Sequence, residues 1–338
     1  MVTRRKYLSA VAAASSVGTM SMAGCLGDGG GGTTQISAAT VFNEDHIQAR
    51  ILSRGVENFV EASDNDYELD LLAGSIGGEE DQMESAATGD IQMHSTSFGG
   101  LTNRYDSEYG FISAPFVAQG WEHLQAIEEE FVHGDDSFNT VLAEEGSQRV
   151  LGGAYRGIRH TTSNMPVTHP DDIEGVPMRL PEIDSWIQPW DEIGVEVTPV
   201  QADELYSALE TGVIEASEGP IGQFNDFSLY EVQSHFSQTG HMVQAYAQVV
   251  STEFWDSLSD ADKDALDQAV QDAIDWGYDT LQGEFDELTQ MVQDEHGTTV
   301  VPAEEVDQQA FQEAAQPALD RLFEEEWLVG YDEVANLA

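Results

Sequence analysis

Apolar and polar positions in the first part of the chain follow two alternating periods, which predict strands and helices in turn. Residues 35–42, 66–73 and 90–95 have the composition of β-strands. Residues 44–62 and 79–87, which lie between them, have apolar positions at helical spacing. This β-α-β-α-β order predicts an α/β fold in which helices cover both faces of a parallel or mixed sheet.

A second unit of alternating strands and helices follows the first. The chain has 338 residues, of which 41% are hydrophobic, so it can bury two cores and we expect two lobes. We predict strands at 149–155, 176–181, 196–200 and 243–251, and helices at 121–131, 183–193 and 203–211.

One predicted helix is much longer than the others. It covers residues 259–297 and begins at Ser259, a residue type that favours the N-cap position. At ~1.5 Å per residue this helix exceeds roughly 50 Å, which is enough to touch both lobes. A coiled coil is the weaker interpretation because the apolar positions show no heptad regularity.

The charge of the chain is strongly negative, which limits the partners that the protein can bind. There are 63 Asp and Glu but only 12 Lys and Arg, for a formal net charge of -51, which excludes nucleic acid. The hydrophobic content is that of a folded protein, so we expect the acids on a solvated surface. At about 1 M salt the Debye length is roughly 3 Å, which cancels most repulsion between such groups. We therefore expect a protein of a halophilic archaeon.

The N-terminus has the features of an export signal. Arg4 and Arg5 precede a short apolar run that ends at Cys25, which predicts a twin-arginine lipoprotein signal at 1–24 with lipidation of Cys25. A free structural cysteine and a permanent membrane anchor are the alternatives, but the run is short of the ~20 apolar residues that a span needs. Residues 25–34 read as a Gly-rich tether.

Three arginines lie close together in a chain that otherwise has few cations. Arg156, Arg159 and Arg179 fall within one segment, which indicates an anionic ligand. A guanidinium can form a bidentate pair with a carboxylate, and Pro181 fixes the backbone just after Arg179. The alternative is an ion pair with one of the chain's own acids. Arg156 is three residues before Arg159 and is expected to point away from it on a strand.

Four segments carry a resemblance to a known family. RGIRHTTSN, DDIEGVPMRLPE, TPVQADELYSALETGVIEASEGP and a later TGH are similar, in order and spacing, to the DctP-type solute-binding proteins of tripartite ATP-independent periplasmic (TRAP) transporters. The resemblance implies a two-lobed periplasmic-binding-protein-like fold, with the long helix crossing both lobes and a ligand cleft between them. It implies residues 35–156 plus 245–284 for lobe I, and 157–244 plus 285–338 for lobe II.

The resemblance also implies roles for individual residues. Arg179 matches the arginine that binds the ligand's carboxylate, and Arg159 matches a second arginine that contacts or orients the same ligand. Glu218 and Gln223 fall in the segment that lines the cleft. Where many relatives have an Asn after the Glu, this chain has Gly219, so we expect that amide to be missing and more room to be left.

Other candidate residues are weighed against ordinary structural roles. Thr96 stands where sialate-type relatives carry a Glu, which weakens a sialic acid assignment. Trp186 and Trp190 lie one helical turn apart and either wall the pocket or pack in the core, with Trp186 the better pocket candidate. His46 and His94 are expected near the cleft, either as ligand contacts or as ordinary hydrogen-bonded side chains.

The sequence therefore favours an extracytoplasmic receptor over an enzyme. We expect it to bind a small organic acid and deliver it to the small and large TRAP membrane subunits, from the extracellular face of the membrane. A receptor of an ABC importer or a sensor module is the alternative. There is no H-E-x-x-H, G-x-S-x-G or P-loop motif, so a hydrolase has little support, and we expect no metal and no cofactor.

Overall fold

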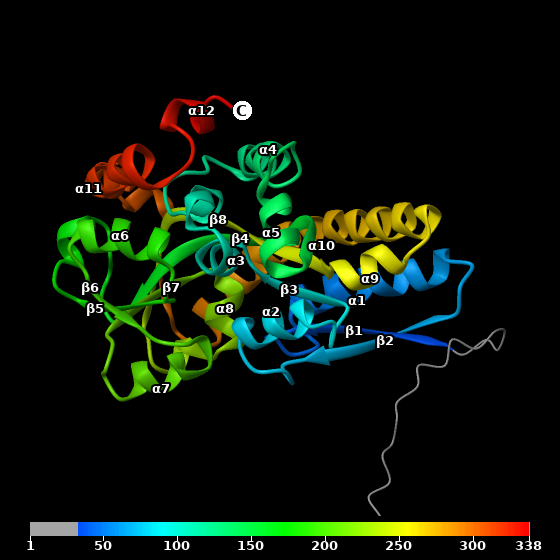
Figure 1. Ribbon diagram of the computed structural model, residues 1–338. Coiled ribbons are helices and arrows are strands. Elements are labelled where there is room, and N and C mark those ends of the chain that lie inside the picture. Colours follow the sequence, from blue (N-terminus) through cyan, green and yellow to red (C-terminus); the bar gives the residue numbers. More distant parts are fainter. Residues whose placement is uncertain (1–32, 338) are drawn as a thin grey trace, which may run out of the picture. The chain divides into compact units, whose positions relative to one another are not determined.

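A single mixed sheet of nine strands forms the centre of the protein (Figure 1). The structure is a computed structural model in which residues 33–337 are described. The predicted export signal, Cys25 and nearly all of the tether lie outside the described residues. Among the described helices, none combines the length and the apolar character that crossing a membrane requires.

The strand order is β2-β1-β3-β8-β4-β7-β5-β6, and β9 pairs with β8. The pairs β1–β2, β1–β3 and β5–β6 are parallel, whereas β3–β8, β4–β8 and β4–β7 are antiparallel. This confirms the predicted mixed sheet. The strands are β1 (Thr34–Thr40), β2 (Tyr67–Ala73), β3 (Met93–Ser97), β4 (Gln148–Ser163), β5 (Pro177–Leu180), β6 (Glu196–Pro199), β7 (Ala216–Gly219), β8 (His235–Ser251) and β9 (Thr299–Val301).

Helices cover the sheet on both faces, as the sequence predicts (Figure 1). Short 3-10 turns and one π-helical turn, η6 (Leu322–Glu326), connect some of them. The α-helices are α1 (Ile47–Ala62), α2 (Glu79–Ala87), α3 (Phe98–Tyr105), α4 (Trp121–Phe131), α5 (Phe138–Gly146), α6 (Asp184–Ile193), α7 (Leu205–Glu210), α8 (Ile221–Asp226), α9 (Thr252–Ser257), α10 (Asp260–Asp294), α11 (Gln308–Arg321) and α12 (Tyr331–Ala335).

Two strands, β4 and β8, are far longer than predicted and join the two lobes. β4 has 16 residues and β8 has 17, where we expected strands only at 149–155 and 243–251. The added residues are mostly polar, and their polar side chains are satisfied across the sheet. Thr161 Oγ1, for example, lies 3.2 Å from Thr239 Oγ1, and Thr162 Oγ1 lies 2.8 Å from Ser217 Oγ. Paired polar side chains allow a strand to continue through the interior where an apolar pattern ends.

The long helix α10 agrees with its prediction. Its 35 residues begin after Ser259, whose side chain accepts a hydrogen bond from the Asp262 backbone N–H at 3.1 Å. Leu266 and Ile274 belong to a buried cluster that includes α1 residues, and Val292 belongs to a different cluster. Figure 1 shows α10 and α1 side by side along the sheet. The helix therefore contributes to both cores.

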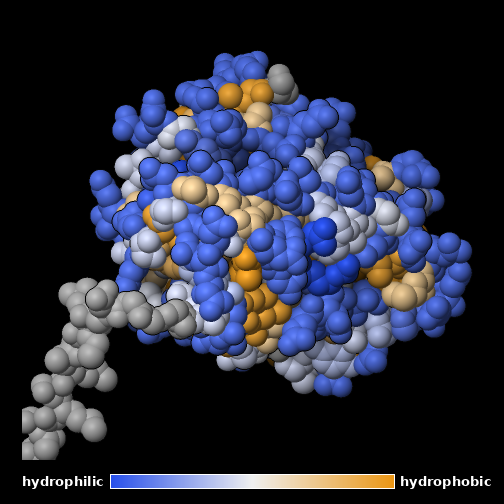
Figure 2. All heavy atoms as spheres, turned by 90° about the vertical axis from the view of Figure 1, so that its right-hand side faces the viewer, coloured by the Kyte–Doolittle hydropathy of each residue, from blue (hydrophilic) through white to orange (hydrophobic). Residues whose placement is uncertain are grey.

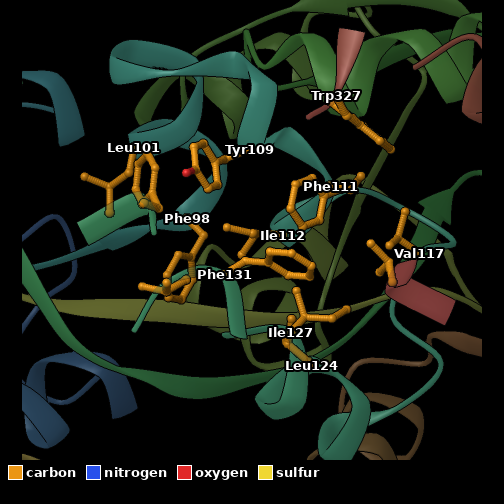
Figure 3. Close-up of a cluster of buried hydrophobic side chains, with 14 of the residues drawn as sticks. Phe98, Leu101, Tyr109, Phe111, Ile112, Val117, Leu124, Ile127, Phe131 and Trp327 are labelled. Atoms are coloured by element: carbon orange, nitrogen blue, oxygen red, sulfur yellow. The ribbon is translucent and has the colours of Figure 1, made fainter. Parts of the chain in front are cut away.

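The largest apolar cluster brings the C-terminal residues onto the first lobe. Phe111 and Phe131 pack edge to face with ring centroids 4.9 Å apart, and Trp327 lies against Phe111 at 6.1 Å (Figure 3). His123 Nε2 is 2.9 Å from the Val334 carbonyl oxygen. The predicted lobe bounds remain a prediction, and residues of 319–334 share this cluster with Phe98 and Val150.

The acidic side chains lie on the surface, as the charge analysis predicts. Among the described carboxylates only Glu128, Glu218 and Asp262 are buried. The face shown in Figure 2 is mostly hydrophilic, with apolar residues exposed in narrow strips. The negative charge is therefore solvated and the core is left to apolar side chains.

Substitution by alanine is expected to have opposite effects on stability at two glycines of α10. A Cβ on Gly277 would stand 2.3 Å from Ile51 Cδ1, whereas a Cβ on Gly283 would meet nothing within 4 Å. We expect Gly277→Ala to destabilise the fold by about 1–3 kcal/mol through overpacking. Gly283→Ala should stabilise it by about 0.4–1 kcal/mol because alanine restricts the unfolded chain. Denaturant unfolding measures both, and equal effects at the two sites would contradict the packing of α10 on α1.

The buried carboxyl of Glu128 makes stability depend on pH. Burial raises its pKa to about 8, although the Gly153 N–H donates to it, and its Oε1 has no hydrogen-bond partner. Because the unfolded chain loses this proton near pH 4.5, unfolding releases a proton between about pH 4.5 and pH 8, and stability falls as pH rises through that window.

Glu128→Gln removes this dependence. As pH rises through the window, the free energy of unfolding of the variant should increase relative to that of the parent by up to roughly 1.4 kcal/mol per pH unit. Unfolding measured at several pH values tests this. Glu129→Gln, an exposed neighbour on the same helix, is the control and should follow the parent. A constant difference between the Glu128→Gln variant and the parent at all pH values would rule out the raised pKa.

Candidate functional site

Three buried arginines form a cluster on β4 and β5, the two strands that flank β7 in the sheet. Arg156 and Arg159 lie on β4 and Arg179 lies on β5. Their exposed fractions are 6%, 1% and 5%, and they are the only buried Lys or Arg among the described residues. We call these three residues the arginine cluster. The chain therefore places its few interior cations together.

A β-bulge turns Arg156 toward Arg159. The pairing of β4 with β8 shifts between Tyr155 and Gly157, so Arg156 is an extra residue in the strand, and Gly157 has a φ of 114°. Both guanidiniums donate to Gln244 Oε1, Arg156 Nη1 at 2.9 Å and Arg159 Nη1 at 2.6 Å. The prediction that Arg156 points away from Arg159 is therefore wrong, because a regular strand alternates faces and a bulged one does not.

Arg159 is held by a buried carboxylate. Its Nε donates to Glu218 Oε2, and its Nη2 donates to Glu218 Oε1 at 2.6 Å and to the Glu218 carbonyl oxygen at 3.0 Å. His241 Nε2 lies 3.2 Å from Glu218 Oε2. Burial favours the neutral acid, but the Arg159 charge and these hydrogen bonds outweigh it and hold the pKa of Glu218 well below its usual value. The ion pair that we left open as an alternative for Arg159 is present.

Arg179 has a different environment. Its Nε donates to the Val200 carbonyl oxygen at 2.7 Å, and no described carboxylate lies within 4 Å of its guanidinium. A guanidinium carries five N–H groups, so the described protein atoms use one of them. Burial lowers the pKa of Arg179 to about 10, partly offset by Glu218, and the side chain stays cationic at neutral pH.

A cavity of about 320 Å³ opens beside Arg156. Residues at the start of α1, at the bulge of β4, along α8 and in the C-terminal half of α10 surround it. Of the predicted site residues, His46 and Gln223 line this cavity, and Arg156 joins them. The lining does not include Arg179, Arg159, Trp186, Thr96, Glu218 or Gly219, which lie buried elsewhere.

His46 is a capping residue as well as a cavity residue. Its Nδ1 accepts from the Gln48 N–H at 3.1 Å at the start of α1, and its ring stacks on Phe42 with centroids 3.8 Å apart. Its Nε2 is 3.7 Å from Asp226 Oδ2. Burial, aided by the Arg156 charge, lowers the pKa of His46 to about 3, so the imidazole is neutral.

The room that we expected at Gly219 is filled. A Cβ on Gly219 would come within 2.5 Å of Gln223 Nε2, so the glutamine amide lies directly over this glycine. Gln223 Nε2 donates to the Glu218 carbonyl oxygen at 3.2 Å, and its Oε1 accepts from Arg156 Nη2 at 3.0 Å. An amide is therefore present after all, and it comes from α8 instead of from position 219.

The remaining candidates separate into site and core residues. Trp186 lies under Arg159, with the guanidinium carbon 4.7 Å from the ring centroid, and its Nε1 donates to the Ser113 carbonyl oxygen. Trp190 is fully buried in an apolar cluster. Thr96 is buried on β3 and its Oγ1 has no hydrogen-bond partner, whereas His94 Nε2 is 2.6 Å from Gln148 Oε1. His94 is thus an ordinary hydrogen-bonded histidine.

Sequence reasoning missed the contribution of β8 and of Phe42. Gln244 bridges two arginines, and Arg156 lies over the rings of Tyr246 and Phe42 at 4.7 and 5.0 Å. In the sequence, His241 stands out only as the last residue of the TGH segment. The sequence signal that could have identified β8 is the presence of glutamines in an otherwise apolar predicted strand. A buried amide needs a hydrogen-bond partner, so such a glutamine points to a polar site. Among the described residues, no group of three or more His, Cys, Asp or Glu side chains could hold a metal ion.

Comparison with known proteins shows the family and the fold of the chain. Residues 39–326 match the DctP family, described as "Bacterial extracellular solute-binding protein, family 7". The chain belongs to this family. The sialic acid-binding periplasmic protein SiaP of Vibrio cholerae is 27% identical over 281 residues, which cover 82% of this chain and 84% of that protein.

Solved structures of TRAP solute-binding proteins share the two-lobed fold. A Roseobacter denitrificans protein with bound 3-deoxy-D-manno-oct-2-ulosonic acid has a TM-score of 0.80 and 25% identity, covering 91% of this chain and 100% of that one. A Fusobacterium nucleatum protein with bound sn-glycerol-3-phosphate has a TM-score of 0.80 and 26% identity, covering 90% and 97%. The predicted fold class, with the long helix and two lobes, is confirmed.

The Arg159–Glu218 pair can be tested by a double-mutant cycle. Glu218→Gln leaves a buried guanidinium without its counter-ion and should cost about 3–5 kcal/mol of stability. Adding Arg159→Met should recover part of this loss, giving a coupling of about 0.5–3 kcal/mol in denaturant unfolding. The exposed pair Arg321–Glu192, joined at 2.8 Å, is the control and should couple by about 0–1 kcal/mol. Additive effects at the buried pair would show that it is not coupled.

Proposed function

We propose that this protein is the extracytoplasmic receptor of a TRAP transporter and that it binds a small organic acid through Arg179. The observation that carries the proposal is the unused hydrogen-bonding capacity of this buried cation. With the described residues, Arg179 donates one hydrogen bond, to the Val200 carbonyl oxygen, and meets no carboxylate. A ligand carboxylate would supply both the acceptors and the counter-charge.

The neighbouring Arg159 supports this role without needing a ligand of its own. Glu218 and Gln244 already take its donors, so it has little capacity left for a solute. We propose that Arg159 and Glu218 set the position of the ligand oxygens, while Arg179 provides the direct contact. Trp186, packed under Arg159, keeps that guanidinium in place.

The relatives support an anionic solute. Those named above bind sialic acid, 3-deoxy-D-manno-oct-2-ulosonic acid and sn-glycerol-3-phosphate, all of which are acids. A solute bound between the two lobes would stabilise their closed arrangement. We propose that this closed form delivers the solute to the membrane subunits.

Export and anchoring complete the proposal. We propose that the twin-arginine signal directs export and that Cys25 carries the lipid that holds the receptor at the extracellular face of the membrane. The acidic surface suits a halophile, in which high salt screens the repulsion between carboxylates.

Arg179→Ala should remove the binding of organic acids and leave the fold intact. A screen of sugar acids, uronic acids and sn-glycerol 3-phosphate by thermal shift identifies a bound acid, and calorimetry then compares variants. Loss of a bidentate, charge-assisted contact should weaken binding by roughly 100-fold or more. Arg321→Ala, an exposed arginine paired with Glu192, is the control. Undiminished affinity in the Arg179→Ala variant would overturn the proposed site.

A further inference from the structure

The cavity of about 320 Å³ is separate from the proposed site at Arg179, which is not among its lining residues. Its volume is at the lower end of the range for ligand pockets, about 300–1,000 Å³, and suits a small molecule. More of its wall is apolar than polar. Ile47 belongs to the buried cluster that includes α1 and the first half of α10, whereas Ile221 belongs to the cluster that includes α8 and the end of α10. A ligand in this cavity would therefore contact both clusters.

Inside the cavity, Arg156 carries a positive charge that no carboxylate contacts. Only 6% of this residue is exposed, and its Nε has no hydrogen-bond partner. Its Nη1 donates to Gln244 Oε1 at 2.9 Å and its Nη2 donates to Gln223 Oε1 at 3.0 Å, so both acceptors are neutral amides. No described carboxylate lies within 4 Å of the guanidinium. A buried cation contacted by neutral groups alone is costly, and a ligand carboxylate would supply the missing counter-charge.

The exposed charges of the cavity have the opposite sign. Asp45, Asp226 and Asp286 line it on the solvent side, and none of them pairs with a described Lys or Arg. The fourth acid of the lining, Glu284, is paired with Arg50 at 3.8 Å. The cavity therefore combines a buried cation that lacks an anion with three exposed anions that lack a cation.

The histidine beside Asp226 does not supply that cation. His46 Nε2 lies 3.7 Å from Asp226 Oδ2, but burial lowers the pKa of His46 to about 3, so the imidazole is neutral. Partial burial raises the pKa of Asp226, as expected for a carboxylate without a counter-ion. Within residues 33–337 the acids do not form a group that could hold a metal ion. The cation that fits them is an ammonium group of a ligand.

We propose that this cavity is a second ligand site and that it binds an ω-amino acid, with its carboxylate at Arg156 and its ammonium group at Asp226. The chain between the two charges lies against Ile47 and Ile221. A monocarboxylate without the amine would meet only acids on the solvent side, and an alkylamine would leave Arg156 without a counter-ion. The inference does not depend on the role of Arg179.

A series of ω-amino acids, from γ-aminobutyrate to ε-aminocaproate, tests the class of ligand by calorimetry. The protein should bind at least one of them roughly 10-fold or more tightly than the alkylamine of equal length, because the buried guanidinium makes a charge-assisted contact. The preference over the monocarboxylate of equal length should be smaller, about 2–5-fold, because the acids are exposed. Failure to bind any member of the series, or equal binding of the alkylamine, would overturn the proposal.

Variants test whether the ligand lies in the cavity. Arg156→Gln should weaken binding of the ω-amino acid by roughly 10-fold and leave the alkylamine within about twofold. Asp226→Asn should weaken it by about 2–5-fold and leave the monocarboxylate unchanged.

Gly222→Leu fills the cavity without removing a polar group. Gly222 lines the cavity, and a Cβ on it would meet nothing within 4 Å, so the fold should tolerate the change while all of these ligands lose binding. Gly283→Leu is the matched control, because this helical glycine has the same room and is not part of the lining. Binding of the ω-amino acid that survives in both Gly222→Leu and Arg156→Gln would overturn the proposal.

These outcomes are distinct from failure of the proposed function. Loss of ω-amino acid binding in Arg179→Ala, with retention in Arg156→Gln and Gly222→Leu, would place the ligand at the proposed organic-acid site. The second site would then fall and the receptor proposal would stand. Organic acids that bind without dependence on Arg179 would overturn the proposed function and leave the second site as it is.

Discussion

The buried pair of Arg159 and Glu218 is the interaction on which the centre of this protein depends. It joins β4 to β7, and Gln244 and His241 add β8 to the same network. A buried charge is tolerated when a partner neutralises it and hydrogen bonds satisfy what remains, and this pair meets both conditions. Because the pair is complete in itself, the guanidiniums beside it can remain available for a ligand.

The other described cations lie mainly against aromatic rings. Arg50 and Arg54 lie over the ring of Trp276, and Arg149 and Lys263 lie over Trp255. Although 63 acids are available, only Arg50 of these four is paired with a described carboxylate, that of Glu284 at 3.8 Å. A contact between a cation and a ring depends on the ring quadrupole and short distance, whereas exposed ion pairs weaken as salt screens them. Most of the described cations therefore lie against an aromatic ring or are held by a buried acceptor, and the exposed Arg321–Glu192 pair is an exception.

The sequence predicts the helices better than the site. Helices α1, α6 and α10 lie close to their predicted bounds because their apolar spacing and N-terminal signals are local. The bulge at Arg156 has no such signal: it depends on the pairing with β8, which is almost 90 residues away in the chain. The filling of Gly219 by Gln223 is similar, since it follows from the way the first turn of α8 folds back over β7. Side-chain placement that depends on a distant strand cannot be obtained from local periodicity.

The proposed anion-binding site, inside a protein of net charge -51, requires that the surface field not reach it. Almost all described carboxylates are on the surface, while the arginine cluster is buried, so solvent ions screen the former and not the latter. At low salt the Debye length of about 10 Å at 0.1 M would carry the repulsion well into the cleft, and at about 1 M it falls to roughly 3 Å. In the proposed site the short-range donors of Arg179 would then decide binding, because long-range attraction of the anion is absent. The acidic surface and the cationic interior are thus compatible under the same condition, a high concentration of salt.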